Sequence, residues 1–134
     1  MLNLNSFKKY FPIIILSTIL AGCAVSGPVK NVATSKSGFD GAAYAGVTRL
    51  IVDDQAELDK YPINERYRVF EQSYTSYGSI PEARDQAEPR AIEFCRAKNK
   101  KMKILEEITS TPPHILGNWP RIEIIFACVD KSKN

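Results

Sequence analysis

The chain has 134 residues, of which 44% are hydrophobic and 25% are charged. A chain of this length has material for one small domain with a single, modest core. Its 18 Lys and Arg residues nearly balance its 15 Asp and Glu residues, which argues against the basic surface that a nucleic-acid-binding protein needs. We therefore expect no nucleic acid among its partners.

The first residues predict an export leader. Met1 to Lys9 contains Lys8 and Lys9 but no acidic residue, and an apolar stretch then leads to small residues before Cys23. This order matches the basic, apolar and cleavage regions of a signal peptide. A transmembrane anchor is the rival interpretation, but residues 11–20 would reach only about 15 Å as a helix, against roughly 30 Å of hydrocarbon.

The leader closes on Leu20-Ala21-Gly22-Cys23. These residues resemble the lipobox of bacterial lipoprotein precursors, which has a small residue before the cysteine and an aliphatic residue three positions before it. The resemblance covers residues 1–23 only. It implies transfer of a diacylglyceryl group to the Cys23 thiol, cleavage after Gly22, and acylation of the new amino terminus, with palmitate as the expected fatty acid. An ordinary signal peptide that leaves Cys23 as a plain thiol is the alternative.

Acylation at Cys23 would attach the mature chain to a lipid bilayer. Two or three acyl chains on one residue satisfy the requirement for stable anchoring. In Gram-negative lipoproteins an Asp after the cysteine resembles the signal for retention in the inner membrane, and this chain has Ala24 there. The resemblance therefore implies the cell outer membrane, with the domain facing the periplasm.

Residues 24–46 are rich in Gly, Ser, Ala and Lys and show no apolar period. That composition predicts a flexible tether, which would hold a folded part about 25 Å from the bilayer at ~5–6 Å times the square root of its residue number. The expected organisation is a signal peptide over residues 1–22, an acylated linker over residues 23–46, and one domain over residues 47–134 whose firm part is residues 66–130.

The first elements of the domain are short. Residues 47–52 form a β-branched run that predicts a strand, and Asp54 and Glu57 have the spacing of a capping box for a brief helix. Residues 67–72 are rich in strand formers and are followed by turn-forming residues.

A longer helix is predicted to begin after Ser79. Ser79 and Glu82 have capping-box spacing, and small side chains then recur every four residues on one helical face. These side chains are Ala83, Ala87, Ala91 and Cys95. Pro89 lies inside this pattern, so we expect either a kink or a second helix start near Glu88.

Two strands complete the domain. Residues 101–109 alternate between faces with a slip at Ile104-Leu105, which suggests a bulge. In residues 121–129, one face carries Ile122, Ile124, Phe126 and Cys128. A helix that covers this face would bring the last of these residues close to the apolar stripe of the helix.

The chain has 3 cysteines. With Cys23 assigned to lipid, Cys95 and Cys128 remain, one on the helix stripe and one on the strand face that the helix would cover. An exported protein would pair them in a disulfide bond.

Residues that carry catalytic or metal chemistry are scarce. The chain has 1 His and no Cys-x-x-Cys motif, and the adjacent carboxylates Asp53-Asp54 and Glu106-Glu107 would point to opposite sides of a strand. We therefore expect no metal ion and no cofactor. The densest basic run, residues 96–103, could touch anionic lipid headgroups, although basic residues are also common at helix C-termini and exposed turns.

The connection over residues 109–120 is the most unusual stretch, because it holds three prolines and the only His and Trp. One interpretation is a stiff loop that presents side chains to a partner, since loops often carry binding residues and Trp is favoured at binding hot spots. The alternative is that these side chains fold back and cap one end of a small core. The candidate partner-binding residues are His114, Ile115, Leu116 and Trp119.

The expected fold is α+β, with β-α-β-β order in its firm part and one helix packed on a short, mainly antiparallel sheet. The pattern over residues 67–129 resembles that of small uncharacterised proteobacterial lipoproteins, a resemblance that implies no particular activity. We expect a membrane-anchored cell-envelope lipoprotein, not an enzyme, that contacts the lipid bilayer through Cys23 and binds an envelope protein or a cell-wall component. The alternatives are a periplasmic enzyme or enzyme accessory with a site near His114, and an envelope stress sensor whose disulfide reports the redox state.

Overall fold

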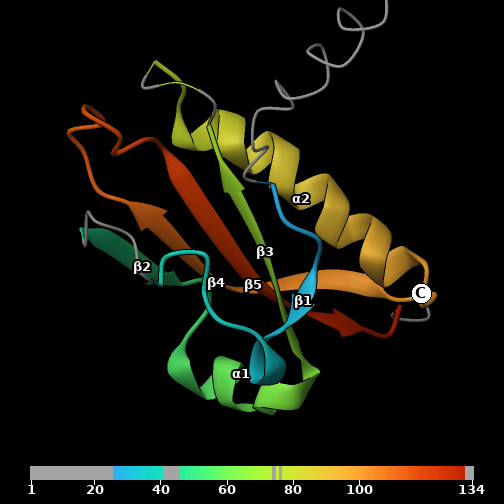
Figure 1. The fold of residues 1–134 in the computed structure, drawn as a ribbon. Helices are drawn as coiled ribbons and strands as arrows, with labels where there is room; N and C mark the ends of the chain where they lie inside the picture. The colour runs from blue at the N-terminus through green and yellow to red at the C-terminus, as the bar shows by residue number, and fades with distance from the viewer. Residues whose placement is uncertain (1–25, 41–45, 74, 76, 132–134) are drawn as a thin grey trace, which may run out of the picture.

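The computed structural model describes residues 26–40, 46–73, 75 and 77–131. In chain order the elements are β1 (Lys30–Asn31), η3 (Val32–Thr34), β2 (Val47–Ile51), α1 (Gln55–Asp59), η4 (Ile63–Glu65), β3 (Arg66–Gln72), α2 (Ile80–Arg96), β4 (Lys101–Ser110) and β5 (Arg121–Val129). The strands form one sheet with the order β1-β3-β5-β4-β2, in which every neighbouring pair is antiparallel. Helix α2 covers one face of this sheet (Figure 1). The α+β class and the predicted β-α-β-β order, here β3-α2-β4-β5, are therefore confirmed.

Helix α2 begins where the capping box predicts. The Ser79 hydroxyl accepts the Glu82 N–H at 3.2 Å, and the Glu82 carboxylate accepts the Ser79 N–H at 3.4 Å. The small side chains of every fourth residue are fully buried against the sheet, which lets the helix lie close to it. The helix continues through Pro89, so of the two expected alternatives, a kink or a second start near Glu88, the second start is excluded. A proline removes only one backbone hydrogen bond, and buried side chains on both sides of it keep the helix on the sheet.

The main core lies between α2 and the sheet. Val69 of β3 and three residues of β5, Ile122, Ile124 and Phe126, pack under the buried stripe of α2. Cys95 and Cys128 form the predicted disulfide across this interface, with their Cα atoms 5.2 Å apart and a sequence separation of 33 residues. Closing a loop of this length contributes about 3 to 4 kcal/mol to stability in the chain-entropy model.

A smaller core lies on the opposite face of the sheet. Helix α1 places Leu58 against Leu105 of β4 and Ala127 of β5. Leu105 belongs to a bulge, because the β4–β5 register shifts between Ile104 and Glu106 as the interrupted alternation predicted. Among the described strands, β2 pairs with β4 alone and forms one edge of the sheet.

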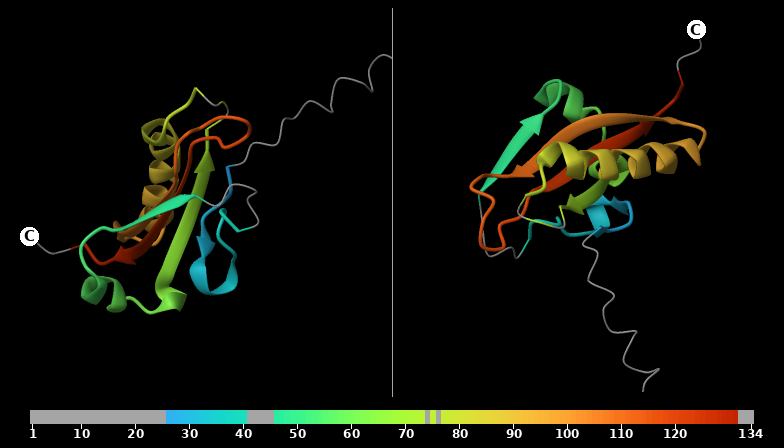
Figure 2. Two further views of the ribbon diagram at one scale, coloured as in Figure 1. Left: turned by 90° about the vertical axis from the view of Figure 1, so that its left-hand side faces the viewer. Right: turned by 90° about the horizontal axis from the view of Figure 1, so that it is seen from above.

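The segment of residues 26–40 corrects the prediction of a flexible tether. Strand β1 pairs with β3 at the other edge of the sheet, with Lys30 opposite Arg68, and Val29 packs against the main core. The left view of Figure 2 shows the segment beside β3. The domain therefore includes residues 26–40, and the predicted domain boundary at residue 47 is wrong.

A side chain of α2 fastens this segment. Arg90 donates to the carbonyl oxygens of Gly27 at 2.6 Å and Phe70 at 3.1 Å, and it also pairs with Glu71. Burial raises the pKa of the Glu71 carboxyl group, and the Arg90 guanidinium offsets part of that rise. The segment is attached through individual side chains and backbone groups. Such contacts leave no apolar period in the sequence, so the composition of residues 24–46 did not predict them.

The predicted leader, the lipobox with Cys23, and residues 41–45 of the predicted linker lie outside the described residues. None of the helices in the described part of the chain is long and apolar enough to span a membrane.

The carboxylate of Glu57 holds α1 to the sheet, and its titration is testable. Hydrogen bonds from Lys103 of β4 and from Lys60 lower the pKa of Glu57 to about 2. Because this pKa is lower in the folded chain than the ordinary value of 4.5, the stabilisation is present above that value and is lost as the pH falls toward 2. Glu57→Gln should therefore weaken the dependence of the urea unfolding midpoint on pH in this window.

The matched control is Glu65→Gln, which changes an exposed carboxylate at the end of η4. The control should keep the acid dependence of the wild-type protein. An unchanged pH profile in Glu57→Gln would show that the contact with Lys103 does not contribute to stability.

Candidate functional site

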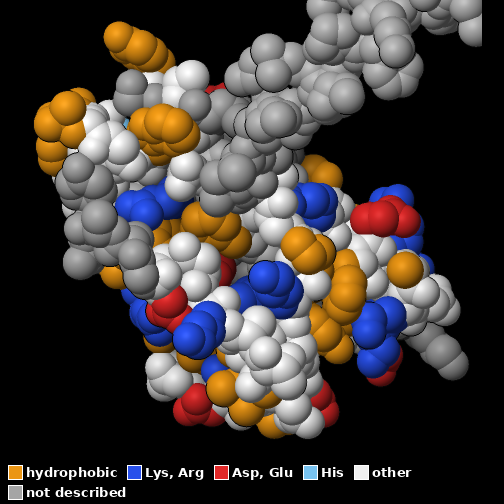
Figure 3. Space-filling view, in the orientation of Figure 1, with side chains coloured by type: hydrophobic (Ala, Val, Ile, Leu, Met, Phe, Trp, Pro, Cys, Tyr) orange, Lys and Arg blue, Asp and Glu red, His pale blue; other side chains and the backbone are white. Residues whose placement is uncertain are grey.

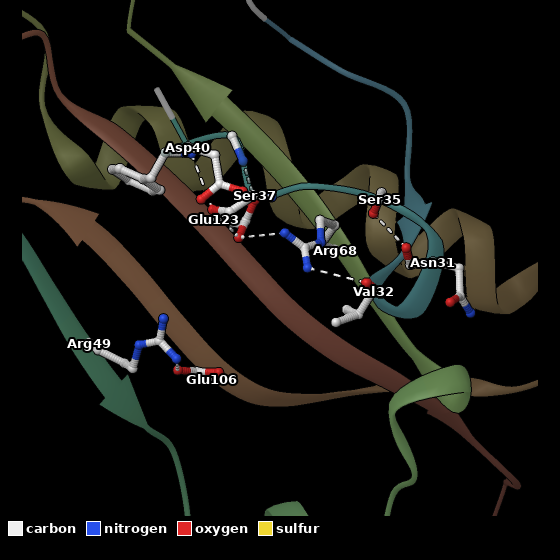
Figure 4. Close-up of polar contacts among 11 residues, drawn as sticks. Asn31, Val32, Ser35, Ser37, Asp40, Arg49, Arg68, Glu106 and Glu123 are labelled. Atoms are coloured by element: carbon white, nitrogen blue, oxygen red, sulfur yellow. Dashed lines mark hydrogen bonds and ion pairs between the residues drawn. The ribbon is translucent and has the colours of Figure 1, made fainter. Parts of the chain in front are cut away.

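Charged side chains gather on the face of the sheet opposite α2. Alternation places Arg68 of β3, Glu123 of β5 and Glu106 of β4 on this face. Arg49 of β2 pairs with Glu106 at 3.0 Å. The segment of residues 26–40 passes over Glu123 and Arg68, whereas Arg49 and Glu106 lie to one side of it (Figure 4).

Glu123 is the centre of this group. It is 1% exposed, and a buried carboxylate is stable only when it is hydrogen-bonded or paired. Its two oxygens accept hydrogen bonds from the Ser37 hydroxyl at 2.9 Å and from the Gly38 backbone N–H at 2.8 Å. A guanidinium nitrogen of Arg68 lies 3.5 Å away. Glu123 thus fixes the N-terminal segment to the middle of the sheet.

The turn over residues 37–40 is held from both sides. The Ser37 N–H donates to the Asp40 carboxylate at 3.1 Å, and Phe39 meets Phe70 edge-on with ring centroids 5.6 Å apart. Gly38 approaches the Phe70 ring so closely that a Cβ atom would lie 2.2 Å from a ring carbon. Only glycine fits here while the turn keeps its place.

The hydrogen-bond donors of Arg68 are not all satisfied. Its side chain is 12% exposed, and the Glu123 carboxylate and the Val32 carbonyl oxygen each lie 3.5 Å from it. These distances are long compared with about 2.7–3.2 Å for an ordinary N–H···O hydrogen bond. The Nε atom of Arg68 is buried and has no hydrogen-bond partner among the described residues. An acceptor that reached this donor would remove the cost of leaving it unsatisfied.

Two cavities open beside Arg68. One of about 410 Å³ lies under the N-terminal segment, and one of about 200 Å³ lies over the central strands. Ser37, Arg68 and Glu123 line both of them. We call the two cavities together the basic cleft, because their linings contain two carboxylates, Glu106 and Glu123, and five cationic side chains, Lys30, Lys36, Arg49, Arg66 and Arg68.

The chemistry of the basic cleft suits an anion. Its two carboxylates already have partners, since Glu123 is bound by the N-terminal segment and Glu106 pairs with Arg49. The excess of cationic side chains gives the cleft a positive potential. A guanidinium group is well matched to phosphate and carboxylate oxygens. Within the described ranges, no three His, Cys, Asp or Glu side chains are placed to hold a metal ion.

The candidate residues of the β4–β5 loop lie outside the basic cleft. His114 and Trp119 are half-buried, and the Ser110 hydroxyl lies 3.1 Å from His114 Nε2 and 3.3 Å from the Trp119 carbonyl oxygen. Ile115 and Leu116 project instead, with exposed fractions of 56% and 84%. Each interpretation of the loop therefore holds for part of it. His114 and Trp119 cap the end of the sheet, whereas Ile115 and Leu116 remain candidates for contact with a partner.

The Ser110–His114 contact lacks the features of a catalytic pair. Ser110 is 3% exposed, and its hydroxyl oxygen accepts the Arg121 N–H at 2.9 Å. Among the described residues, Ser110 is the hydrogen-bonding partner of the His114 ring, and no carboxylate orients the imidazole. An activated nucleophile needs both access to a substrate and an oriented base.

The basic cleft was only partly visible in the sequence. Alternation along the last strand places Glu123 on the face away from the helix, and an acidic residue in the middle of an apolar strand indicates a buried carboxylate that needs donors. Its donors, Ser37 and Gly38, are 86 and 85 residues away in the chain. No local pattern connects them.

No protein-family model, curated protein or solved structure matches this chain. The candidate site therefore consists of the basic cleft and the exposed tip of the β4–β5 loop.

Replacing Glu123 with Ala tests the attachment of the N-terminal segment. The change removes the acceptor for Ser37 and Gly38 and leaves the largely buried Arg68 without its counter-ion. We expect the free energy of unfolding, measured by urea denaturation, to fall by about 3 kcal/mol. Residues 26–40 should also become more sensitive to a protease in native buffer.

Glu93→Ala is the matched control, because Glu93 pairs with Arg96 on the exposed side of α2. Loss of this surface pair should cost less than about 1 kcal/mol. Equal losses in the two variants, or an unchanged cleavage rate in Glu123→Ala, would contradict the role given to Glu123.

Proposed function

We propose that this chain is a lipid-anchored lipoprotein of the cell envelope, and that its domain is a non-enzymatic binding module that holds an anionic group in the basic cleft. The proposed binding role rests on the position and hydrogen bonding of Arg68. This residue lines both cavities, and its buried Nε donor has no partner among the described residues.

A phosphate or carboxylate group would complete the hydrogen bonding of Arg68. Arginine stays charged, presents its donors in a rigid fork and is more weakly hydrated than lysine, so it suits a partly buried anion site. Lys30 and Lys36 are exposed and line the larger cavity. They would attract an anion over about 10 Å at 0.1 M salt, so binding should weaken as the salt concentration rises.

The envelope location rests on the sequence, with one structural observation in support. Leu20-Ala21-Gly22-Cys23 resembles a lipobox, and Ala24 after the cysteine implies export to the outer membrane. The Cys95–Cys128 disulfide suits an oxidising compartment. We place the domain on the periplasmic side, where an envelope protein or a cell-wall component would supply the anionic group.

Two other functions receive less support. An enzymatic site near His114 would need an accessible reacting group, whereas the Ser110 hydroxyl beside His114 is buried. A redox sensor would need an accessible disulfide, whereas Cys95 of α2 is fully buried against the sheet.

Inorganic phosphate tests the basic cleft directly. At matched ionic strength, phosphate should raise the Tm of the wild-type protein in a concentration-dependent way, because a ligand that binds only the folded chain stabilises it. Arg68→Met should abolish this rise when each protein is compared with its own Tm in chloride. Arg96→Met, which removes an exposed arginine of α2, should keep it. A wild-type Tm that does not change with phosphate would argue against an anion site at Arg68, as would a rise in the Tm of Arg68→Met equal to that of wild type.

Cys23→Ser tests the anchor separately. Mass spectrometry of the amino-terminal peptide from cells should show a diacylglyceryl group and further acylation on Cys23 of the wild-type protein, and neither on Ser in the variant. Wild-type protein should remain with the membranes after a high-salt wash, because acyl chains and not charges hold it. A mature wild-type chain that begins at an unmodified Cys23 would overturn the lipoprotein assignment and would leave the phosphate result to stand alone.

A further inference from the structure

The chain enters the domain at the end of the sheet where β3 finishes. Lys30 pairs with β3 in antiparallel register, so the residues before it run toward Gln72, the last residue of β3. The hydrogen bond from Arg90 to the Gly27 carbonyl oxygen holds this path against α2 and β3. Ser26 therefore lies near the end of β3.

This end of the sheet must lie close to Cys23. Only Ala24 and Val25 separate Cys23 from Ser26, and three residue steps span at most about 11 Å in any conformation. An acylated Cys23 is fixed at the bilayer surface, because its chains lie in the hydrocarbon. The Gln72 end of the sheet is then held next to the membrane.

Among the described residues, the two most exposed large apolar side chains, Tyr77 and Leu116, lie at this end. Tyr77 in the β3–α2 turn is 97% exposed, and Leu116 and Ile115 in the β4–β5 loop are 84% and 56% exposed. The two connections are neighbours, because the Ser73 N–H donates to the Pro120 carbonyl oxygen at 2.8 Å. Apolar side chains stand out at this end in the space-filling view (Figure 3). We call this region the apolar end.

We propose that the apolar end docks on the bilayer that holds the acyl chains of Cys23, with Tyr77, Ile115 and Leu116 inserted at the level of the headgroups and upper acyl chains. The inference rests on the proposed acylation of Cys23. Tyrosine suits this position, because its ring is apolar and its hydroxyl stays in contact with the polar layer. The anchor and the apolar side chains, which are independent features, thus lie at one end of the domain.

The basic run over residues 96–103 lies at the opposite end. Strand β5 is 9 residues long, so its ends are about 26 Å apart at ~3.3 Å per residue. Gln72 pairs with Arg121 at the apolar end, whereas Lys101 pairs with Val129 at the other end. A bilayer that meets the apolar end is therefore out of reach of the basic run.

Trp119 is a built-in reporter of this orientation, because it is the only Trp of the chain and it lies in the β4–β5 loop. Acylated protein purified from membranes would be placed in vesicles of phosphatidylethanolamine and phosphatidylglycerol, with and without bromine on the upper acyl chains. Bromine quenches only nearby indole rings, so docking at the apolar end predicts a fall in Trp119 fluorescence in the brominated vesicles. Mass spectrometry of the same sample would establish whether Cys23 is acylated.

The variant Tyr77→Ser with Ile115→Ser should lose most of this quenching while it still floats with the vesicles. Its matched control is Ile63→Ser, because Ile63 is 57% exposed, like Ile115, but precedes β3 at the far end of the sheet. The control should be quenched as strongly as wild type. Acylated wild-type protein whose Trp119 is not quenched would overturn the orientation alone. An unacylated Cys23 would overturn the anchor and, with it, the orientation.

Discussion

The buried carboxylate of Glu123 is the constraint on which the rest of the structure depends. A buried carboxylate on the open face of a sheet needs donors around it, and the N-terminal segment supplies two of them through Ser37 and Gly38, with Arg68 beside them. These contacts hold residues 26–40 against the sheet, and the segment encloses the basic cleft. Together with Arg90, which holds Gly27 near β3, these contacts set the direction from which the chain enters the domain, on which the proposed orientation toward the membrane rests.

The attachment of this segment changes the geometry expected at the membrane. A flexible tether over residues 24–46 would hold the domain about 25 Å from the bilayer, whereas the observed path leaves only a short connection from Cys23 to Ser26. The larger cavity of the basic cleft is lined by Ser26, Gly27 and Pro28. The proposed anion site thus lies within a few residues of the proposed anchor, which would put membrane-proximal anions, including lipid phosphates, within its range.

Sequence reasoning predicted the elements whose signals are local or periodic. The capping box at Ser79, the stripe that ends at Cys95, the alternation of the last strand and the disulfide to Cys128 are all present. It missed the role of residues 26–40, because their attachment depends on contacts with residues far away in the chain, which composition and period do not encode. For the same reason the sequence pointed to the β4–β5 loop, where unusual residues are adjacent, rather than to the basic cleft, whose residues come from several distant segments.

Residues 26–40 are a folded part of the domain, and Glu123 holds them there. Amide hydrogen exchange of the wild-type protein at Gly38 tests it most directly, because this N–H is hydrogen-bonded to the Glu123 carboxylate at 2.8 Å. We expect exchange at least ~100-fold slower than in an unstructured peptide, as for an amide that opens only with loss of local structure. Exchange at the rate of an unstructured peptide would contradict it, and the segment would then be a tether after all.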